Sequence, residues 1–456
     1  MFKELLLPEV KRLIRDKDWS GLKEFLKESY PSDIADLLEE LDEPDALILF
    51  RLLSREKAAD VFAELEPGKQ ESLLKQFNNQ EIKELVAELD TDERTRLFEE
   101  LPGKLTQKLL DTLPPEERRE ALEILAYPEN SVGRLITPDY VAVMPSWTVE
   151  QAIEHIRQTG EDAETINMIY VVDEEGHLVD DIPIRRFILA DPKQKVDSLM
   201  DRHFISILAS EDQEEAVRLV KKYNLVALPV TDSKGILIGI VTVDDILDVS
   251  EEENTEDFQR IGGVTAETKA LGFITNIIET PLSKLYKMRI NWLIILLFMD
   301  VATGGIISFF ESTIAKYIVL VTFLPVLVDT GGNAGAQSAT LMVRAIALGN
   351  VKLNDWIRLL GKEFLVSGAL GFTMGLGISI MGIIRGGIKI AMVVSTAMLI
   401  NVIIGSTLGM SLPFIFTRLK KDPATASTPL ITTICDIVGT ATYFLIAVSL
   451  LELFQI

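Results

Sequence analysis

The pattern of hydrophobic and polar positions divides the chain into three regions, and the first is a repeat. The stretches "ADLLEELDEPD", "ADVFAELEPGK" and "KELVAELDTDE" recur with a period of 24 residues within residues 31–113. Leucines stay in register through this repeat, at Leu41, Leu65, Leu89 and Leu113. Each unit would pair short amphipathic helices whose apolar faces need a neighbouring unit to bury them. We therefore expect an all-α helical-repeat domain over residues 1–131.

The second region, residues 132–257, alternates short β-rich runs with helical segments. The runs "MIYVV", "LVALPV" and "ILIGIVTV" alternate with "TVEQAIEHIRQ" and "DQEEAVRLVKKY", which favours an α/β fold. Two copies are visible, because "INMIYVVDEEGHLV" corresponds to "NLVALPVTDSKGILI". The region resembles a tandem pair of cystathionine-β-synthase (CBS) domains, modules that commonly bind adenosyl ligands and transmit regulation.

The second copy carries Gly239, Thr242 and Asp245, which resemble the ribose-contacting pattern of CBS domains. The resemblance makes Thr242 and Asp245 candidate nucleotide-binding residues, with ATP as the candidate ligand. A Thr-x-x-Asp sequence just before an apolar helix is also close to an ordinary helix-capping arrangement. Both interpretations stay open at this point.

The third region consists of long apolar segments suited to lipid. A bilayer core of about 30 Å requires helices of about 20 residues. The pattern predicts an α-helical transmembrane domain over residues 288–456. Residues 258–287 are expected to form a long amphipathic connecting helix, interrupted near Pro281. The expected spans are five, at residues 289–311, 315–345, 356–384, 388–417 and 428–452.

The distribution of charge indicates how the chain is oriented in the membrane and what kind of partner it binds. The formal net charge is −24, and residues 288–456 hold 8 acidic and 11 basic residues, which leaves residues 1–287 with a net charge of −27. Such acidity argues against nucleic acid and favours a cation. Basic residues gather before the first span and in the second and fourth connections. The charge distribution predicts a multi-pass protein of the cell membrane, with cytoplasmic N-terminal domains and the C-terminus outside.

Three acids, Asp300, Asp329 and Asp436, lie deep in the expected spans, with no lysine or arginine at comparable depth. A carboxylate near the bilayer centre costs about 2.5–3.5 kcal/mol on insertion scales, so a cation or a water-filled path explains them better than buried ion pairs. An intramembrane aspartyl protease would need a close carboxylate pair with separated pKa values. The chain has no GxGD-like motif, and we expect no enzyme activity.

The second and fifth spans supply further oxygen atoms. In "LPVLVDTGGNAGAQSAT", Pro325 is expected to kink the helix, and the glycines allow close backbone approach. Asn333 is a candidate pore-lining amide, and the alternative is that its polar side chain holds packed helices together. Thr432 and Asp436 share a face at a spacing of four residues. Carboxylate, hydroxyl and carbonyl oxygens are hard donors that suit Mg²⁺ or Ca²⁺.

The order of regions, together with "TGGNAGAQSAT" and "TTICDIVG", resembles the MgtE family of magnesium channels and transporters over essentially the whole chain. The resemblance implies a homodimer with the pore between subunits and a cytoplasmic part that binds Mg²⁺ and closes the pore when the ion is plentiful. It also implies that Asp436 is the pore carboxylate, Asn333 a pore-lining amide and Thr432 a carbonyl donor. Asp300 and Asp329 match no motif position.

The function expected from these observations is a Mg²⁺-selective channel or transporter that imports magnesium. A transporter of Co²⁺ or Mn²⁺, or a CBS-regulated membrane sensor without flux, would use the same architecture.

The segment "DDILDVSEEENTEDFQR" gathers acids that repel one another at a spacing of four residues on a helix. Bound divalent cations would relieve this repulsion, although a solvated acidic surface is the simpler alternative for any single residue. The candidate metal ligands of this cytoplasmic sensor come from the repeats, the acidic segment and the connection before the last span: Glu66, Asp90, Asp92, Asp248, Glu252, Glu253, Glu256, Asp257 and Asp422.

Overall fold

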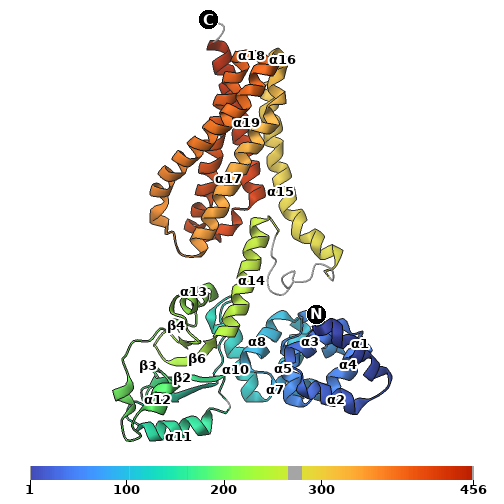
Figure 1. Ribbon diagram of the computed structural model, residues 1–456, viewed down its shortest axis with the longest axis vertical. Coiled ribbons are helices and arrows are strands. Elements are labelled where there is room, and N and C mark those ends of the chain that lie inside the picture. The colour runs from blue at the N-terminus through green and yellow to red at the C-terminus, as the bar shows by residue number, and fades with distance from the viewer. Residues whose placement is uncertain (1, 102, 162, 265–279, 454–456) are drawn as a thin grey trace. The chain divides into compact units, whose positions relative to one another are not determined.

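A computed structural model describes residues 2–101, 103–161, 163–264 and 280–453 of the chain (Figure 1). The described residues form two compact units, the first reaching residue 251 and the second beginning at residue 252.

The first part of the first unit is a series of short helices. Prolines occupy the first turn of several of them, for example Pro31, Pro67 and Pro115, where the missing N–H has no intrahelical partner in any case. The helices are α1 (Phe2–Arg15), α2 (Trp19–Glu28), α3 (Pro31–Glu40), α4 (Glu43–Arg51), α5 (Arg55–Ala63), α6 (Pro67–Gln76), α7 (Asn79–Glu88), α8 (Thr91–Glu100), α9 (Gly103–Thr112) and α10 (Pro115–Leu125).

Alternate helices of this series stack on one another, so that α3 packs on α5, α5 on α7 and α7 on α9. The four leucines in register lie at the ends of these helices, and all are buried. One hydrophobic core runs through the whole helical series. The predicted helical-repeat architecture is confirmed.

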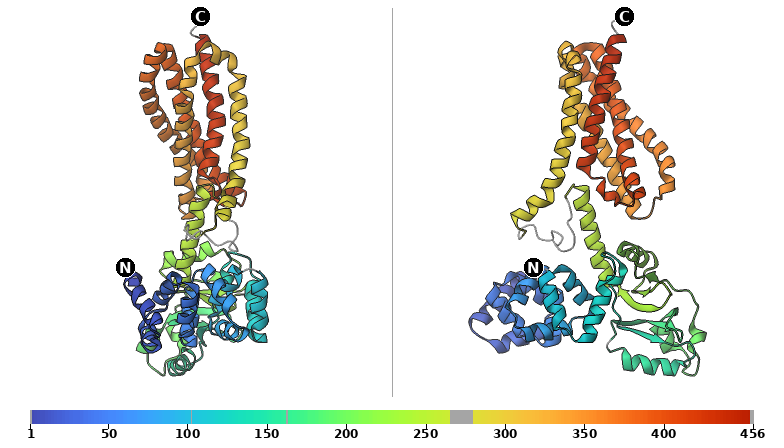
Figure 2. Two further views of the ribbon diagram at one scale, coloured as in Figure 1. Left: turned by 90° about the vertical axis from the view of Figure 1, so that its right-hand side faces the viewer. Right: turned by 180° about the vertical axis from the view of Figure 1, so that it is seen from behind.

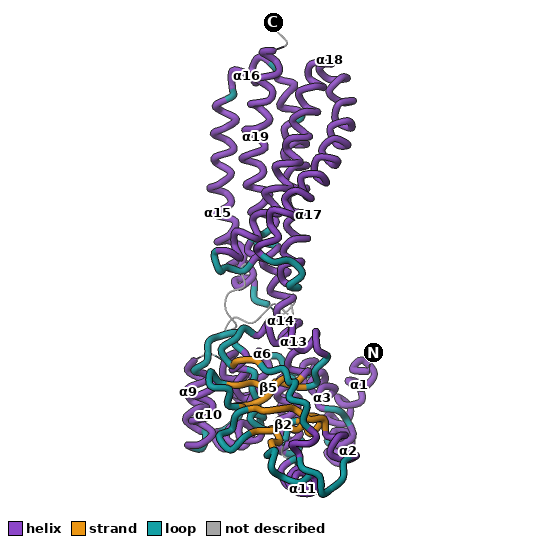
Figure 3. Tube along the Cα trace, turned by 90° about the vertical axis from the view of Figure 1, so that its left-hand side faces the viewer, coloured by secondary structure: helices purple, strands orange, loops and turns teal. Residues whose placement is uncertain are grey.

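The rest of the first unit contains two small sheets of the same topology. In each sheet the first strand pairs parallel with the second, and the second pairs antiparallel with the third. The strands are drawn in orange in Figure 3. The first sheet has β1 (Tyr140–Val143), β2 (Thr165–Val172) and β3 (Leu178–Pro183), with α11 (Val149–Thr159) and α12 (Ile184–Leu189). The second has β4 (Ile207–Leu208), β5 (Ala227–Thr231) and β6 (Leu237–Thr242), with α13 (Gln213–Tyr223) and α14 (Val243–Ile261).

The two copies share a core, because Tyr170 of β2 is buried with Ala227 and Leu237 of the second sheet. The Tyr140 hydroxyl also donates a hydrogen bond to the Leu237 carbonyl at 3.1 Å. The two copies predicted from the sequence therefore form one paired α/β body.

The second unit is a bundle of long apolar helices. Within the described ranges, four helical stretches are long and apolar enough to cross a membrane. Its elements are α15 (Leu282–Phe309), α16 (Glu311–Lys316), α17 (Leu324–Ala347), α18 (Trp356–Arg418) and α19 (Thr428–Leu453).

The 63-residue α18 is interrupted at Gly387, whose φ of 76° and ψ of −173° are not helical. The chain reverses there, and the two arms, residues 356–386 and 388–418, lie side by side (Figure 2). The Ser395 hydroxyl donates to the Gly375 carbonyl at 3.0 Å across this pair. The interruption falls inside the connection that the hydrophobic pattern predicts between residues 384 and 388.

Pro325 and Pro281 both lie at the starts of helices in the structure. Pro325 is the second residue of α17, so it starts this helix and does not kink it, because a proline in the first turn removes no intrahelical hydrogen bond. Half of the expected connecting helix over residues 258–287, namely residues 265–279, lies outside the described residues. Its first residues belong to α14, and Pro281 is the N-cap of α15.

Candidate metal sites

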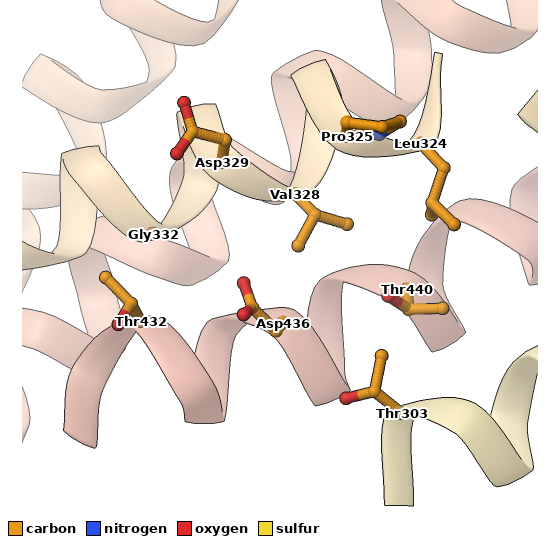
Figure 4. Close-up of a pocket in the computed structure, with 9 residues that line it drawn as sticks. All are labelled: Thr303, Leu324, Pro325, Val328, Asp329, Gly332, Thr432, Asp436 and Thr440. Carbon is orange, nitrogen blue, oxygen red and sulfur yellow. The ribbon is translucent and has the colours of Figure 1, made fainter. Parts of the chain in front are cut away.

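A pocket of about 500 Å³ lies within the membrane unit, between α15, α17 and α19 (Figure 4). Asp436 projects into it from α19, and Asp329 lies on the wall that α17 provides. Asp300 lies on α15 and is not among the lining residues. The remaining lining residues are Thr303, Leu324, Pro325, Val328, Gly332, Thr432 and Thr440.

Close packing of α17 brings its wall of the pocket into place. An added Cβ at Gly332 would lie 3.3 Å from the methyl carbon of Thr432, and one at Gly335 only 2.8 Å from the Gly405 carbonyl oxygen. The contact at Gly335 is with a backbone atom that cannot turn aside, so the close approach of the helices depends on glycine at this position. The expected close backbone approach at the α17 glycines is confirmed.

The predicted pore residues are divided between the pocket and its surroundings. Thr432 and Asp436 line the pocket together, one turn apart on α19. The Thr432 hydroxyl donates to the Pro429 carbonyl at 3.0 Å. Asn333 is not among the lining residues; its amide Nδ2 donates to Asp329 Oδ2 at 3.1 Å, on an exposed side of α17. Sequence reasoning left Asp329 without a role, and in the structure it lines the pocket and accepts the hydrogen bond from Asn333.

The first unit holds a cluster of carboxylates, which we call the carboxylate cluster: Asp90, Asp92, Glu93, Glu164 and Asp245. Burial raises the pKa of Asp92 to about 6, and burial together with the charge of Asp92 raises the pKa of Asp245 to about 7. The Asp92 and Asp245 side chains lie close enough for each to affect the pKa of the other. Burial and then the neighbouring acids also raise the pKa of Glu93 to about 8 and of Glu164 to about 7.

The predicted sensor residue Asp92 thus meets the predicted nucleotide contact Asp245. The Thr242 hydroxyl donates to Asp245 Oδ2 at 2.7 Å, which places the two candidate ribose contacts together. Gly239 is required nearby, since an added Cβ would lie 2.8 Å from the Thr137 carbonyl oxygen. Neither Glu93 nor Glu164 was singled out from the sequence, and Glu164 lies in an unremarkable turn before β2.

The other predicted sensor residues are placed elsewhere. Asp248 forms an ion pair with Arg96 at 3.0 Å. The backbone N–H of Glu66, at the start of α6, donates to the Glu39 carboxylate at 2.9 Å. Glu252 and Glu253 lie on α14.

In the second unit, Arg260 forms ion pairs with both Glu256 and Asp422. Burial raises the pKa of the neighbouring Asp257, against the lowering effect of Arg260. Reasoning from acidic residues alone missed this arginine. Among the residues that the structure describes, no three His, Cys, Asp or Glu side chains are already arranged to hold a metal ion.

The family models match successive parts of the chain. Residues 29–130 match the MgtE intracellular N domain, residues 132–191 and 196–252 match the CBS domain, and residues 324–446 match MgtE, described as a divalent cation transporter.

Two curated relatives are named magnesium transporter MgtE. The one from Thermus thermophilus is 36% identical over 452 residues, which cover 98% of this chain and 99% of the relative. The one from Bacillus subtilis is 36% identical over 330 residues, 72% of this chain and 71% of the relative.

Two crystal structures resemble the soluble part of the chain. The cytosolic domain of the Mg²⁺ channel MgtE in complex with ATP has a TM-score of 0.51 and 36% identity, with 54% of this chain and all of that one covered. The soluble part of a magnesium transporter has a TM-score of 0.52 and 29% identity, over 55% and 99% of the two chains. This chain is therefore a multi-pass membrane protein that belongs to the MgtE family of magnesium transporters, whose members move ions and are not enzymes.

Proposed function

We propose that this protein imports Mg²⁺ through a channel-like pathway in which Asp436 attracts the ion. The observation that carries the proposal is the pocket in the membrane unit, where Asp436 projects among oxygen-bearing side chains. Mg²⁺ releases its water shell reluctantly, so a site with few carboxylates can recognise the hydrated ion. Thr432, on the same face of α19, adds a backbone carbonyl, and Asn333 adds an amide at the exposed side of α17.

The membrane unit crosses the bilayer five times in this proposal. Each arm of α18 has 31 residues, a length of about 46 Å at 1.5 Å per residue, which exceeds the hydrocarbon core of about 30 Å. With α15, α17 and α19, the two arms make five crossings. An odd number places the chain ends on opposite sides, and the basic residues near the first span and the even connections favour cytoplasmic N-terminal domains and an external C-terminus.

A second copy of the chain completes the pathway. Asp329, Asn333 and Gln337 follow one another at a spacing of four residues on α17, and all three are exposed in the single chain. Polar side chains are costly against lipid and face a water-filled cavity instead. We expect this face of α17 to meet its equivalent across the axis of a homodimer, with the pore between the subunits.

The cytoplasmic part closes the pore when Mg²⁺ is plentiful. In the carboxylate cluster, Asp92 and Asp245 are buried together, and burial raises the cost of ionising each of them. A divalent cation removes this cost, and it shifts the balance of open and closed states by its difference in affinity for the two. The other sensor candidates of the first unit, Glu66, Asp90 and Asp248, add to the negative charge of that unit.

ATP is the proposed ligand of the second CBS copy. A crystal structure of a related cytosolic domain contains ATP, and Thr242 and Asp245 are adjacent here. Asp245 would then serve both the nucleotide and the cation, so the binding of the two ligands should be linked. Calorimetric titration with ATP at two Mg²⁺ concentrations measures this linkage, and an affinity that does not change contradicts it.

The experiment is Mg²⁺ entry into proteoliposomes that contain the full-length protein. We expect flux in the wild type, suppression of flux by Mg²⁺ on the face of the soluble domains, and loss of flux in Asp436→Asn. Glu311→Gln, which removes one charge from the exposed start of α16, is the control and should conduct normally. Normal flux in Asp436→Asn would refute the role of this residue. If the wild type moved Co²⁺ or Mn²⁺ and not Mg²⁺, the proposed selectivity would be wrong, and no flux of any divalent ion would favour a sensor.

A further inference from the structure

The proposed function places Asp329 on the pore-facing side of α17 but gives it no contact with the ion. It lies one turn before Asn333 on α17 and lines the same pocket as Asp436, which belongs to α19 (Figure 4). One carboxylate oxygen, Oδ2, accepts the hydrogen bond from Asn333 at 3.1 Å. This bond holds the Asp329 side chain at the wall of the pocket and leaves the other oxygen for a ligand.

Two hydroxyl groups of the pocket also lack partners. Thr440 is 1% exposed, and its Oγ1 has no hydrogen-bond partner among the described residues. The Oγ1 of Thr303, on α15, is buried and equally without a partner in the described ranges. A buried hydroxyl without a partner costs about 1–3 kcal/mol. Water that accompanies a ligand in the pocket would remove this cost.

The size and charge of the pocket select the ligand. Six waters of a hydrated divalent cation occupy about 180 Å³, at about 30 Å³ for each water. The pocket, at about 500 Å³, accommodates such an ion with further water. Two carboxylates together neutralise a divalent cation and leave a monovalent one overcompensated, so a pair favours the divalent ion.

We propose that Asp329 is a second carboxylate ligand of this pocket and that one hydrated divalent cation is held through its water shell between Asp329 and Asp436. The outer waters of the ion bond to the hydroxyls of Thr303 and Thr440. This inference rests on the proposed transport function and deepens it, because it adds a binding residue that sets affinity and selectivity for the cation.

The test compares concentration dependence of Mg²⁺ flux in proteoliposomes for the wild type, Asp329→Asn and Asp300→Asn. Asp300 is the matched control, because it is also an aspartate within a membrane-spanning helix but its side chain does not line the pocket. We expect the half-saturating Mg²⁺ concentration to rise about tenfold in Asp329→Asn, the effect of losing one charge-assisted contact. The flux ratio of Mg²⁺ to Na⁺ should fall in parallel. Asp300→Asn should change either quantity by less than about threefold, and Asp329→Glu should restore most of the affinity.

Equal effects in Asp329→Asn and Asp300→Asn would overturn the inference, because they would indicate a general field and no contact. An unchanged half-saturating concentration in Asp329→Asn would do the same. A second measurement does not depend on flux. Cys435 is the only cysteine in the sequence, so a Cys435→Ala background has no thiol of its own. In that background, Thr303→Cys should react with a small charged thiol reagent, and Mg²⁺ should slow the reaction unless Asp329→Asn is also present. Slowing that persists with Asp329→Asn contradicts the inference, whereas a wild type without flux contradicts the proposed function alone.

Discussion

The contact between α17 and the second arm of α18 predicts a large effect of one methyl group. An added Cβ at Gly409 would lie 1.9 Å from the Gly335 carbonyl oxygen, and one at Gly405 would lie 2.1 Å from the Gly331 carbonyl oxygen. Both neighbours are backbone atoms and cannot turn aside. Gly409→Ala therefore has to push the two helices apart.

The size of the effect follows from this distance. Ordinary contact begins near 3.4 Å, so the helices must separate by about 1.5 Å at this point. Overpacking of this kind costs about 1–3 kcal/mol, and alanine recovers up to about 1 kcal/mol of helix propensity. We expect a net loss near 2 kcal/mol, which lowers the melting temperature by about 4–8 °C for a unit of this size. Flux should fall as well, because α17 carries Asp329 and Gly332 of the pocket.

The assay is thermal unfolding of the purified protein in detergent, followed by flux in proteoliposomes. Gly377→Ala is the matched control, since Gly377 lies on the first arm of α18 and an added Cβ there meets nothing within 4 Å. If Gly409→Ala were as stable and as active as Gly377→Ala, the helices would not be in backbone contact and the reasoning would be refuted.

Three further predictions concern single side chains. The pKa of Asp245 is about 7 in the folded protein, against 3.8 for the ordinary carboxyl. Between these two pH values the folded state therefore binds more protons than the unfolded state. The free energy of unfolding of the metal-free protein should fall as pH rises from 5 to 8. The free energy lost is about 1.4 kcal/mol per unit of pKa difference. Circular dichroism melts in EDTA should show a smaller loss of stability with pH in Asp245→Asn than in the wild type. An equal loss in the two proteins would contradict the raised pKa of Asp245. Arg260→Gln leaves Glu256 and Asp422 without their cation, so added Mg²⁺ should raise its melting temperature more than that of the wild type, and an identical response would argue against the ion pairs. Tyr443→Phe removes a buried hydrogen bond of 2.9 Å to a backbone carbonyl and should cost about 1 kcal/mol in the same melts, whereas unchanged stability would indicate that water replaces the hydroxyl.

The location of the functional residues was partly visible in the sequence. Asp436 stood out because a carboxylate inside an apolar segment is costly wherever that segment folds. The same argument marked Asp329 and Asp300, but it gave them no partner. Glu164 carried no signal, because an acid in a polar turn is ordinary until burial and its neighbours raise its pKa to about 7.

The sequence alone determined the properties that each segment carries within itself. These properties are the 24-residue repeat, the doubled α/β pattern and the lengths of the apolar segments. They depend on local periodicity and on the free energy of single residues in water or lipid. The interruption at Gly387 likewise falls where the hydrophobic pattern ends one segment and starts the next.

Only the tertiary structure decided which segments touch. Gly335 and Gly409 are far apart in the chain, and their contact depends on the shapes of two whole helices. Arg260 lies between Glu256 and Asp422 because the end of α14 folds against the connection before α19. The contacts of Gly335 with Gly409 and of Arg260 with Asp422 minimise the energy of the folded unit as a whole, and no short window of sequence contains both partners of either contact.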